Sequence, residues 1–268
     1  MSNESKTAAA LAERIGLSQE AIAQAQRYPL DADELAAQYS LLRRSADAFI
    51  ADNDAQKQPA QRYLALFYGF LPRALAAYTQ SGISEQVFVD TFRDLARWEE
   101  KHFLCTGEHG VSEQEWLVGH YRMELFALGE LQFQPAMGAP RGLPPEWRRL
   151  TALNVHIPKG ADLTQKDAAY RAALAFFHLP HALFLCHSWL LSPKLPALLP
   201  RGGRILDFQR DFSLLSVDYG DRQAEERIFD AVLDDFSAYP EDTTLRRAAK
   251  ACLLRGEKIP AALGAFAL

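Results

Sequence analysis

Apolar side chains recur at helical spacing through the first 120 residues of the chain. Over residues 35–50, and again over 87–98, they return every three or four positions, which is the period of a helix with one buried face. Ser18 and Ser84 stand directly before such runs, where a helix N-cap is expected. The pattern predicts a bundle of helices whose aromatic side chains pack into a common core.

Beyond residue 123 the period changes from that of a helix to that of a strand. Leu131 and Phe133 alternate with Glu130 and Gln132, which predicts a half-buried strand within residues 124–134. Further elements follow in alternation. They are a strand over 153–157, a helix over 161–177, a strand over 181–187 that is apolar on both faces, a strand-like run over 205–217 and a helix over 225–236.

The predicted layout is therefore a helical N-terminal domain over residues 1–122 and a domain of mixed helices and strands over residues 123–268. Its fold class is α+β or α/β, a helical bundle followed by a sheet domain. A chain of 268 residues is long enough for two domains that each bury a core.

Composition and charge exclude several function classes. A net charge of −5 argues against nucleic acid as a partner, because phosphate binding needs clustered cationic charge. No run approaches the roughly 20 apolar residues of a membrane span, and the N-terminal residues lack a secretory pattern. The three cysteines are odd in number and widely spaced, so they predict neither disulfides nor a zinc site but a reduced, cytoplasmic protein. The oligomeric state stays open.

The segment from Ile157 to Thr164 joins a predicted strand to a predicted helix. The first N–H groups of a helix lack internal acceptors and can bind phosphate, and Lys159 and Gly160 suit a close anion. Thr164 and Asp167 also form a capping pattern for this helix. The alternative is an ordinary connection, in which the charge of Asp162 would repel phosphate.

Residues 186–188, Cys-His-Ser, end the apolar strand. Neighbouring strand residues point to opposite faces, so Cys186 and His187 are poorly placed to act together, and Cys186 is expected in the core. His187 and Ser188 lie where open sheets bind ligands, and they serve either function or local capping.

Glu130 and His156 stand on the polar sides of two predicted strands. If these strands pair, the two side chains line a common cleft as general base and partner; otherwise they are exposed to solvent. No set of residues with metal-ligand spacing is present, so no metal is expected.

Several segments together resemble a bacterial acyltransferase-like family with a helical N-terminal domain and a GNAT-like C-terminal domain. The resemblance covers about residues 85–268. It rests on DTFRDLARWEEKH (90–102), the Trp116-Leu117 pair, FALGELQF (126–133), LNVHIP (153–158), FFHLP (176–180), CHSWLL (186–191), ILDFQRDF (205–212) and the closing Gly264 and Phe266.

The resemblance implies a GNAT-like sheet in which a strand leads into a pyrophosphate loop and the next parallel strand splays away to admit the pantetheine arm. The cosubstrate it implies is acetyl-CoA or another acyl-CoA, held by Ile157, Lys159, Gly160, Ala161 and Thr164. The implied reaction is acyl transfer to a small-molecule acceptor, an amine that attacks the thioester directly. The implied catalytic residues are Glu130 as base, His156 and His187 beside the carbonyl, and Ser188 as the acid for the leaving thiolate.

The chain departs from the usual GNAT pattern at two places. Only Gly160 stands in the loop that normally carries a Gln/Arg-x-x-Gly-x-Gly/Ala signature, and no tyrosine follows residues 181–187. These departures favour a second hypothesis, a non-catalytic ligand-binding or interaction protein on a GNAT-like scaffold. A third, a hydrolase using Cys186 or Ser188, lacks the G-x-S-x-G elbow.

Overall fold

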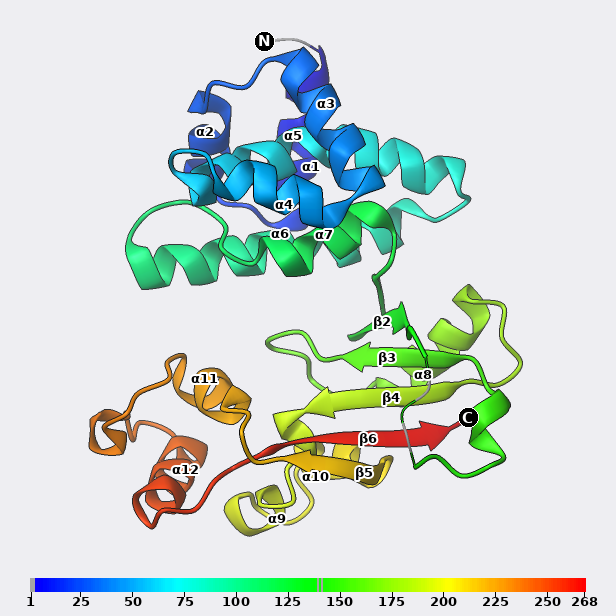
Figure 1. Cartoon of the computed structure of the whole chain (residues 1–268), viewed down its shortest axis with the longest axis vertical. Helices are drawn as coiled ribbons and strands as arrows, with labels where there is room; N and C mark the ends of the chain where they lie inside the picture. The colour runs from blue at the N-terminus through cyan, green and yellow to red at the C-terminus, as the bar shows by residue number, and fades with distance from the viewer. Residues whose placement is uncertain (1–2, 139, 141) are drawn as a thin grey trace. The chain divides into compact units, whose positions relative to one another are not determined.

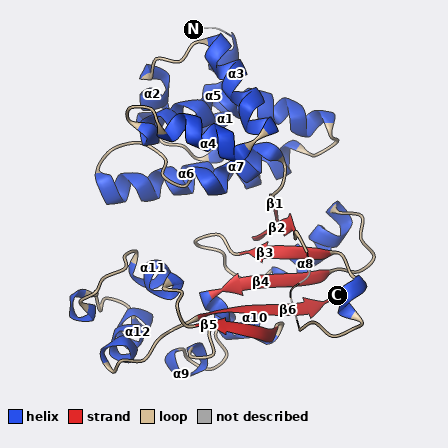
Figure 2. Cartoon of the chain, viewed as in Figure 1, coloured by secondary structure: helices blue, strands red, loops and turns tan. Residues whose placement is uncertain are grey.

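The computed structural model of the protein describes residues 3–138, 140 and 142–268. The chain forms two compact units, Met1–Leu128 and Gly129–Leu268. The first is helical almost throughout, whereas the second combines a sheet with helices (Figures 1 and 2). The predicted α+β class with a helical N-terminal part is confirmed.

The helical unit is built from helices that follow one another through short connections. Its elements are α1 (Asn3–Ile15), α2 (Gln19–Arg27), α3 (Ala32–Arg44), α4 (Ala46–Asp54), α5 (Pro59–Gln80), α6 (Glu85–Thr106), α7 (Gln114–Arg122) and the short strand β1 (Phe126–Leu128). Ser18 and Ser84 cap α2 and α6, as predicted, by accepting the N–H groups of Ala21 and Val87.

Aromatic rings fill the core of this unit. The ring of Phe67 on α5 stacks on Tyr121 of α7 with centroids 5.1 Å apart, and Phe92 of α6 meets the same tyrosine edge-on at 4.8 Å. All three side chains are at most 1% exposed. The predicted packing of the aromatic side chains into a common core is confirmed, and it joins α5, α6 and α7.

The second unit alternates strands and helices. Its elements are β2 (Leu131–Pro135), η1 (Trp147–Arg149), β3 (Ala152–His156), α8 (Lys166–Phe176), β4 (Leu183–Ser188), η2 (Trp189–Leu191), α9 (Leu195–Leu198), α10 (Arg204–Arg210), β5 (Ser213–Asp218), α11 (Gln223–Phe229), η3 (Phe236–Ala238), α12 (Thr244–Leu254) and β6 (Ala261–Ala267). The strands of this unit lie in the order β2-β3-β4-β6-β5.

Most neighbouring strands of this sheet are antiparallel, and one pair is parallel. β2 runs antiparallel to β3, β4 antiparallel to β6, and β6 antiparallel to β5, whereas β3 and β4 run in the same direction. Helix α8 is the crossover between these two parallel strands and covers one face of the sheet. Its Tyr170 contacts the rings of Phe133, Phe184 and Phe266, which come from β2, β4 and β6.

Gly264 lies in the middle of strand β6, where the packing of the sheet leaves no room for a side chain. A Cβ atom on Gly264 would lie 2.8 Å from Leu191 Cδ1 and 2.9 Å from Phe212 Cβ, closer than real Cβ contacts. The absent side chain lets η2 and the start of β5 close over the centre of the sheet. No strand was predicted for this segment, although it forms β6 inside the sheet.

Three predicted elements are wrong in detail. Residues 124–134 form two strands rather than one, because Gly129, at φ +76°, turns the chain between them. The run over 205–217 begins as helix α10 and becomes strand only at Ser213. The helix expected over 225–236 ends at Phe229, where Asp230 takes a left-handed conformation at φ +59°.

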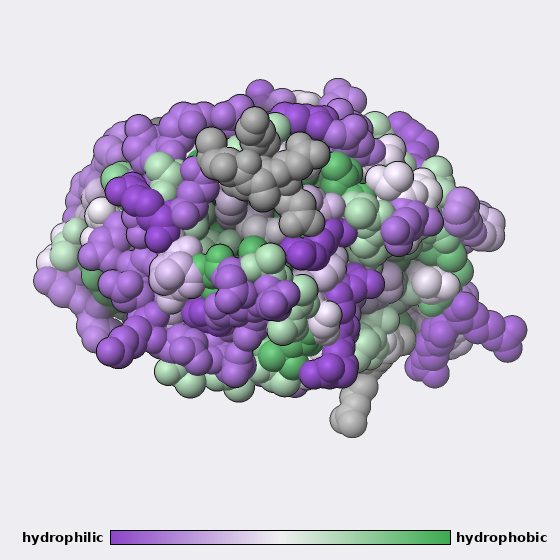
Figure 3. Space-filling model, turned by 90° about the horizontal axis from the view of Figure 1, so that it is seen from above, coloured by the Kyte–Doolittle hydropathy of each residue, from purple (hydrophilic) through white to green (hydrophobic). Residues whose placement is uncertain are grey.

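The surface seen in Figure 3 is mostly hydrophilic, with small apolar patches between the polar groups. Among the residues that the structure describes, no helix is long and apolar enough to span a membrane.

Candidate functional site

The parallel strands β3 and β4 pair over only part of their length. Their register joins Ala152 to Leu183 and ends with Asn154 opposite Leu185, although β3 runs to His156 and β4 to Ser188. We call the remaining ends, residues 155–156 of β3 and 186–188 of β4, the β3–β4 fork. Strands that part in this way leave backbone N–H and C=O groups on their inner edges for a ligand.

Both predicted histidines lie in this fork. His156 follows Asn154 by two residues on β3, and His187 follows Leu185 by two residues on β4. Since paired residues share a face and side chains alternate along a strand, both imidazoles belong to the same face of the sheet. That face is opposite to the one covered by Phe133, Phe184 and α8. The register therefore places His156 and His187 on one face of the sheet, at the ends of neighbouring strands.

His187 has acidic neighbours from the turn after β5. Its Nε2 lies 4.0 Å from Oδ2 of Asp221. His187, Asp218 and Asp221 each offer one side-chain atom of the kind that binds metal ions, and these three atoms lie within 4.8 Å of one another. Hydrogen bonds from Gly220 N–H to Asp218 and from Gln223 N–H to Asp221 hold the two carboxylates. A carboxylate at this place can orient the imidazole.

Our sequence analysis did not identify Asp218 and Asp221. The D-Y-G-D sequence at residues 218–221 is a turn signal, but only the register of β4, β6 and β5 brings this turn next to His187. The turn at residues 218–221 could therefore be predicted from the sequence, whereas its position next to His187 could not.

Ser188, the last residue of β4, has a structural task. It is 6% exposed, and its Oγ accepts the N–H of Leu190, 3.1 Å away, at the start of η2. Of the two interpretations given above, local capping is the one with a visible contact. Its hydroxyl hydrogen remains a donor that this contact does not use.

Cys186 lies in the core, as predicted. It is 1% exposed on the face opposite to His187, and burial raises the pKa of its thiol well above the usual value. A thiol that stays protonated is a poor nucleophile, so the hydrolase hypothesis loses its cysteine.

The loop from Ile157 to Thr164 follows β3 directly. Gly160, at φ +84°, has open space where a side chain would stand, and Lys159 is exposed and pairs with Asp230 at 3.1 Å. The carboxylate of Asp162, whose charge was expected to repel a phosphate, forms an ion pair with Arg204 of α10. The loop thus offers an accessible backbone at Gly160 and one cationic side chain, Lys159, while Arg204 of α10 neutralises Asp162.

The start of α8 differs from the prediction. The helix begins at Lys166, and Thr164 donates to Asp162, 3.0 Å away, rather than capping with Asp167. Leu163 takes φ +63°, which turns the chain so that the expected capping geometry does not form. Instead the carboxylate of Glu130 accepts the N–H of Gln165 at 2.9 Å.

Glu130 therefore lies in the turn before β2 and not on the strand. The residue of β2 that pairs with His156 is Gln132, which is 1% exposed. The neighbouring position of β2 and β3 is confirmed, but the visible contact of Glu130 is with the helix that follows the loop. A carboxylate at a helix N-terminus is stabilised by the helix dipole.

The first turn of α8 is also held by an ion pair between Lys166 and Asp211. Neither residue was among the predicted site residues. Lys166 is 8% exposed, and its Nζ lies 2.7 Å from Asp211 Oδ2, which also accepts from the hydroxyl of Tyr170 at 3.4 Å. Burial acts to lower the pKa of Lys166, but the hydrogen bond and charge of Asp211 outweigh it and leave the pKa above the usual value. These contacts tie the start of α8, next to the loop, to Asp211.

Comparisons with protein-family models match both units. Residues 125–266 match the GNAT-like C-terminal domain, and residues 6–123 match the N-acyltransferase N-terminal domain. A search of curated protein sequences finds no match.

Solved structures with the same fold include several described as acyltransferases. One, in complex with decanoyl-CoA and teicoplanin, has a TM-score of 0.78 at 23% identity, over 98% of this chain and 88% of that chain. A mutant acyltransferase in complex with octanoyl-CoA gives the same values. A third, in complex with decanoyl-CoA, has a TM-score of 0.76 at 23% identity, over 97% of this chain and 87% of that chain.

Proposed function

Because the chain belongs to the family defined by the GNAT-like C-terminal domain, we propose that it is an acyl-CoA-dependent N-acyltransferase. The observation that carries the proposal is the β3–β4 fork, where two parallel strands stop pairing and leave two histidines on one face. The loop after β3 leads from this fork to the N-terminus of a helix, which suits a thioester with a phosphate-bearing tail. The similar acyltransferase structures with bound acyl-CoA support the same assignment.

In this proposal the loop holds the pyrophosphate of acyl-CoA. The backbone of Ile157, Gly160 and Ala161 approaches the anion, and Lys159 and Thr164 contribute a charge and a hydroxyl. Gly160 has room for such an approach, and the exposed Lys159 can exchange its surface partner Asp230 for a phosphate at little cost. Arg204 offsets the charge of Asp162 beside the loop.

The pantetheine arm then lies in the fork, with the thioester carbonyl near His156 and His187. An amine attacks the carbonyl carbon, a C–N bond forms, the C–S bond breaks, and the amine proton passes to a base. Glu130, His156 and His187 are the groups proposed to accept or relay that proton, with Asp221 orienting His187. Ser188 is proposed to donate its hydroxyl hydrogen to the leaving thiolate. Because its side chain alternates to the face opposite His187, a water molecule would carry that proton, and the protonated base would return one to the serine.

The acceptor in this proposal is a small molecule that carries an amine. A similar acyltransferase structure contains teicoplanin, and others contain octanoyl and decanoyl chains. A medium-length acyl chain is therefore included among the candidate donors beside acetyl-CoA. A bacterial origin and a cytoplasmic location, where its three unpaired thiols would stay reduced, complete the proposal.

Isothermal titration with acetyl-, octanoyl- and decanoyl-CoA tests the cosubstrate. We expect saturable heat with at least one of them, and a clear loss of affinity in the Gly160→Val variant, whose side chain would occupy the approach to the loop. Gly142→Val, at another glycine with positive φ and open surroundings, is the matched control. The absence of a heat signal with every acyl-CoA at high protein concentration would remove the assignment.

The second candidate function is acyl-CoA binding without transfer. One contact favours it: the Glu130 carboxylate already accepts the N–H of Gln165 at the start of α8. Titration heat without release of free CoA in the presence of a panel of amines would select this candidate.

A further inference from the structure

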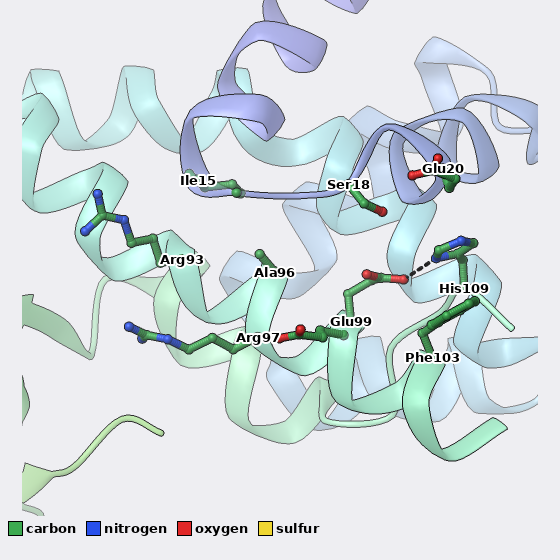
Figure 4. Close-up of a pocket in the computed structure, with 11 residues that line it drawn as sticks. Ile15, Ser18, Glu20, Arg93, Ala96, Arg97, Glu99, Phe103 and His109 are labelled. Atoms are coloured by element: carbon green, nitrogen blue, oxygen red, sulfur yellow. Dashed lines mark hydrogen bonds and ion pairs between the residues drawn. The ribbon is translucent and has the colours of Figure 1, made fainter. Parts of the chain in front are cut away.

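A cavity of about 590 Å³ lies in the helical unit, beside α6 (Figure 4). It is lined by the turn between α1 and α2, by one side of α6 and by the loop after it. The lining residues are Ile15, Gly16, Ser18, Glu20, Arg93, Ala96, Arg97, Glu99, Glu100, Phe103 and His109. This volume is within the range of small-molecule sites, and none of these residues belongs to the GNAT-like unit.

The floor of the cavity is apolar. Ile15 is 1% exposed, and Ala96 lies beside it in the lining. Phe103 stacks on His109 with centroids 4.5 Å apart and remains 41% exposed. A compact apolar body can therefore rest against Ile15, Ala96 and one edge of this aromatic pair.

The positive charges of the lining are already matched. Arg93 lies 2.8 Å from Asp90 and Arg97 lies 2.7 Å from Asp94, each one helical turn earlier on α6. Figure 4 shows both arginines at one end of the cavity, away from Glu99 and His109. These guanidinium groups are therefore poor partners for an anionic ligand.

The negative charges are in excess. Glu99 is 4% exposed, and its Oε1 lies 2.6 Å from His109 Nδ1, which places a buried carboxylate at the aromatic end. Glu20 and Glu100 form no ion pair within residues 3–138, 140 and 142–268. The lining thus carries three carboxylates and one histidine, and the two arginines, each paired with an aspartate, do not compensate the carboxylates. A bound cation would lower this unfavourable charge.

We propose that this cavity binds a primary ammonium group carried on a compact apolar body. The ammonium donates to the carboxylates of Glu20, Glu99 and Glu100, which we call the acidic end of the cavity. The apolar body covers Ile15, Ala96 and Phe103. The site belongs to the helical unit alone and does not depend on the acyl-transfer proposal, because it requires neither the fork nor the loop.

The test uses three probes with the same six-carbon body and different charge: n-hexylammonium, 1-hexanol and hexanoate. Binding to the full chain is followed by amide chemical shifts and by titration calorimetry. We expect hexylammonium to bind at least tenfold more tightly than hexanol, hexanoate not to bind, and the shifted amides to lie within residues 15–20 and 93–109. Equal affinity for hexanol, tighter binding of hexanoate, or shifts elsewhere would overturn the proposal.

Variants separate the cavity from general surface charge. Glu20→Gln with Glu100→Gln changes two exposed side chains, so folding is not at risk, and we expect at least a fivefold weaker affinity for hexylammonium. Glu115→Gln, at an exposed glutamate of α7 outside the lining, is the control and should leave the affinity unchanged. If the double variant binds hexylammonium as tightly as the Glu115→Gln control does, Glu20 and Glu100 do not select the ammonium group, and the proposal fails.

Discussion

The side chain of Glu130 connects the turn before β2 to the start of α8, because its carboxylate accepts the N–H of Gln165. It is also the residue that we propose as general base. The two roles use different properties of the same group: one needs an acceptor oxygen, and the other needs a carboxylate that can take a proton.

Replacing Glu130 by Gln separates these roles. Glutamine keeps an oxygen for Gln165 N–H but cannot act as a base, so we expect turnover to fall by a factor of about 10² to 10⁴ while acyl-CoA binding stays intact. Steady-state release of CoA and titration calorimetry measure the two quantities. Glu146→Gln, an exposed glutamate, is the control. Unchanged turnover would exclude Glu130 from the chemistry.

Lys166 and Asp211 provide a test through stability. The folded-state pKa of Lys166 is raised, so its contribution is complete below the unfolded pKa of about 10.4 and is lost as pH rises through the higher folded value. We expect Lys166→Met to lower the free energy of unfolding at pH 8 by about 1–3 kcal/mol, because Asp211 keeps a partly buried, unmatched charge.

The difference between wild type and Lys166→Met should shrink above about pH 11, where the wild-type ammonium loses its proton. Denaturant unfolding at pH 8 and pH 11 measures it. Lys159→Met removes an exposed pair and should cost at most about 1 kcal/mol at either pH. A difference between wild type and Lys166→Met that does not change with pH would show that packing, not charge, accounts for the effect.

At the scale of elements, strand β6 needs a glycine at position 264, because any side chain there would collide with Leu191 and Phe212. We expect Gly264→Ala to destabilise the protein by about 1–3 kcal/mol, because the new Cβ meets Leu191 and Phe212 inside contact distance. Gly119→Ala on α7 is the control. Nothing lies within 4 Å of its Cβ position, and alanine favours a helix, so stability should stay equal or rise. Thermal unfolding of both variants decides the matter.

Helices with a clear period and an N-cap residue, α2 and α6, could be predicted from the sequence, and so could the strands β3 and β4, whose runs of apolar residues are short and distinct. Those that failed lacked one of these signals. Residues 205–210 carry apolar side chains that suit either a helix or a strand, and Leu206 and Phe208 are both buried in the helix that forms. The segment of β6 is rich in alanine and glycine, so its strand conformation depends on its neighbours β4 and β5 rather than on its own pattern.

The candidate site follows the same rule. His156 and His187 could be placed from the sequence because both stand at the ends of recognisable strands. Asp221 and Asp211 could not, since each comes from an element whose position depends on the sheet order. The family resemblance supplied the function, and our proposal places its chemistry at the β3–β4 fork.

At the scale of the whole chain, the two proposed ligands should act on different segments. Hydrogen exchange with bound acyl-CoA should slow amides in β3, the following loop and β4, whereas hexylammonium should slow those of residues 15–20 and 93–109. Each ligand alone, measured by mass spectrometry of the full chain, serves as the control for the other. Protection of the same peptides by both ligands would contradict the assignment of separate sites.

The position of β6 has a consequence for how the protein is made. Residues 261–267 lie between β4 and β5, so the sheet stays split until this last strand has left the ribosome. The helical unit precedes it in the chain and already has its own aromatic core. A chain that contains the helical unit and strands β2 to β5 but not yet β6 would thus hold a folded helical unit and a half-built sheet whose strand edges are exposed to aggregation.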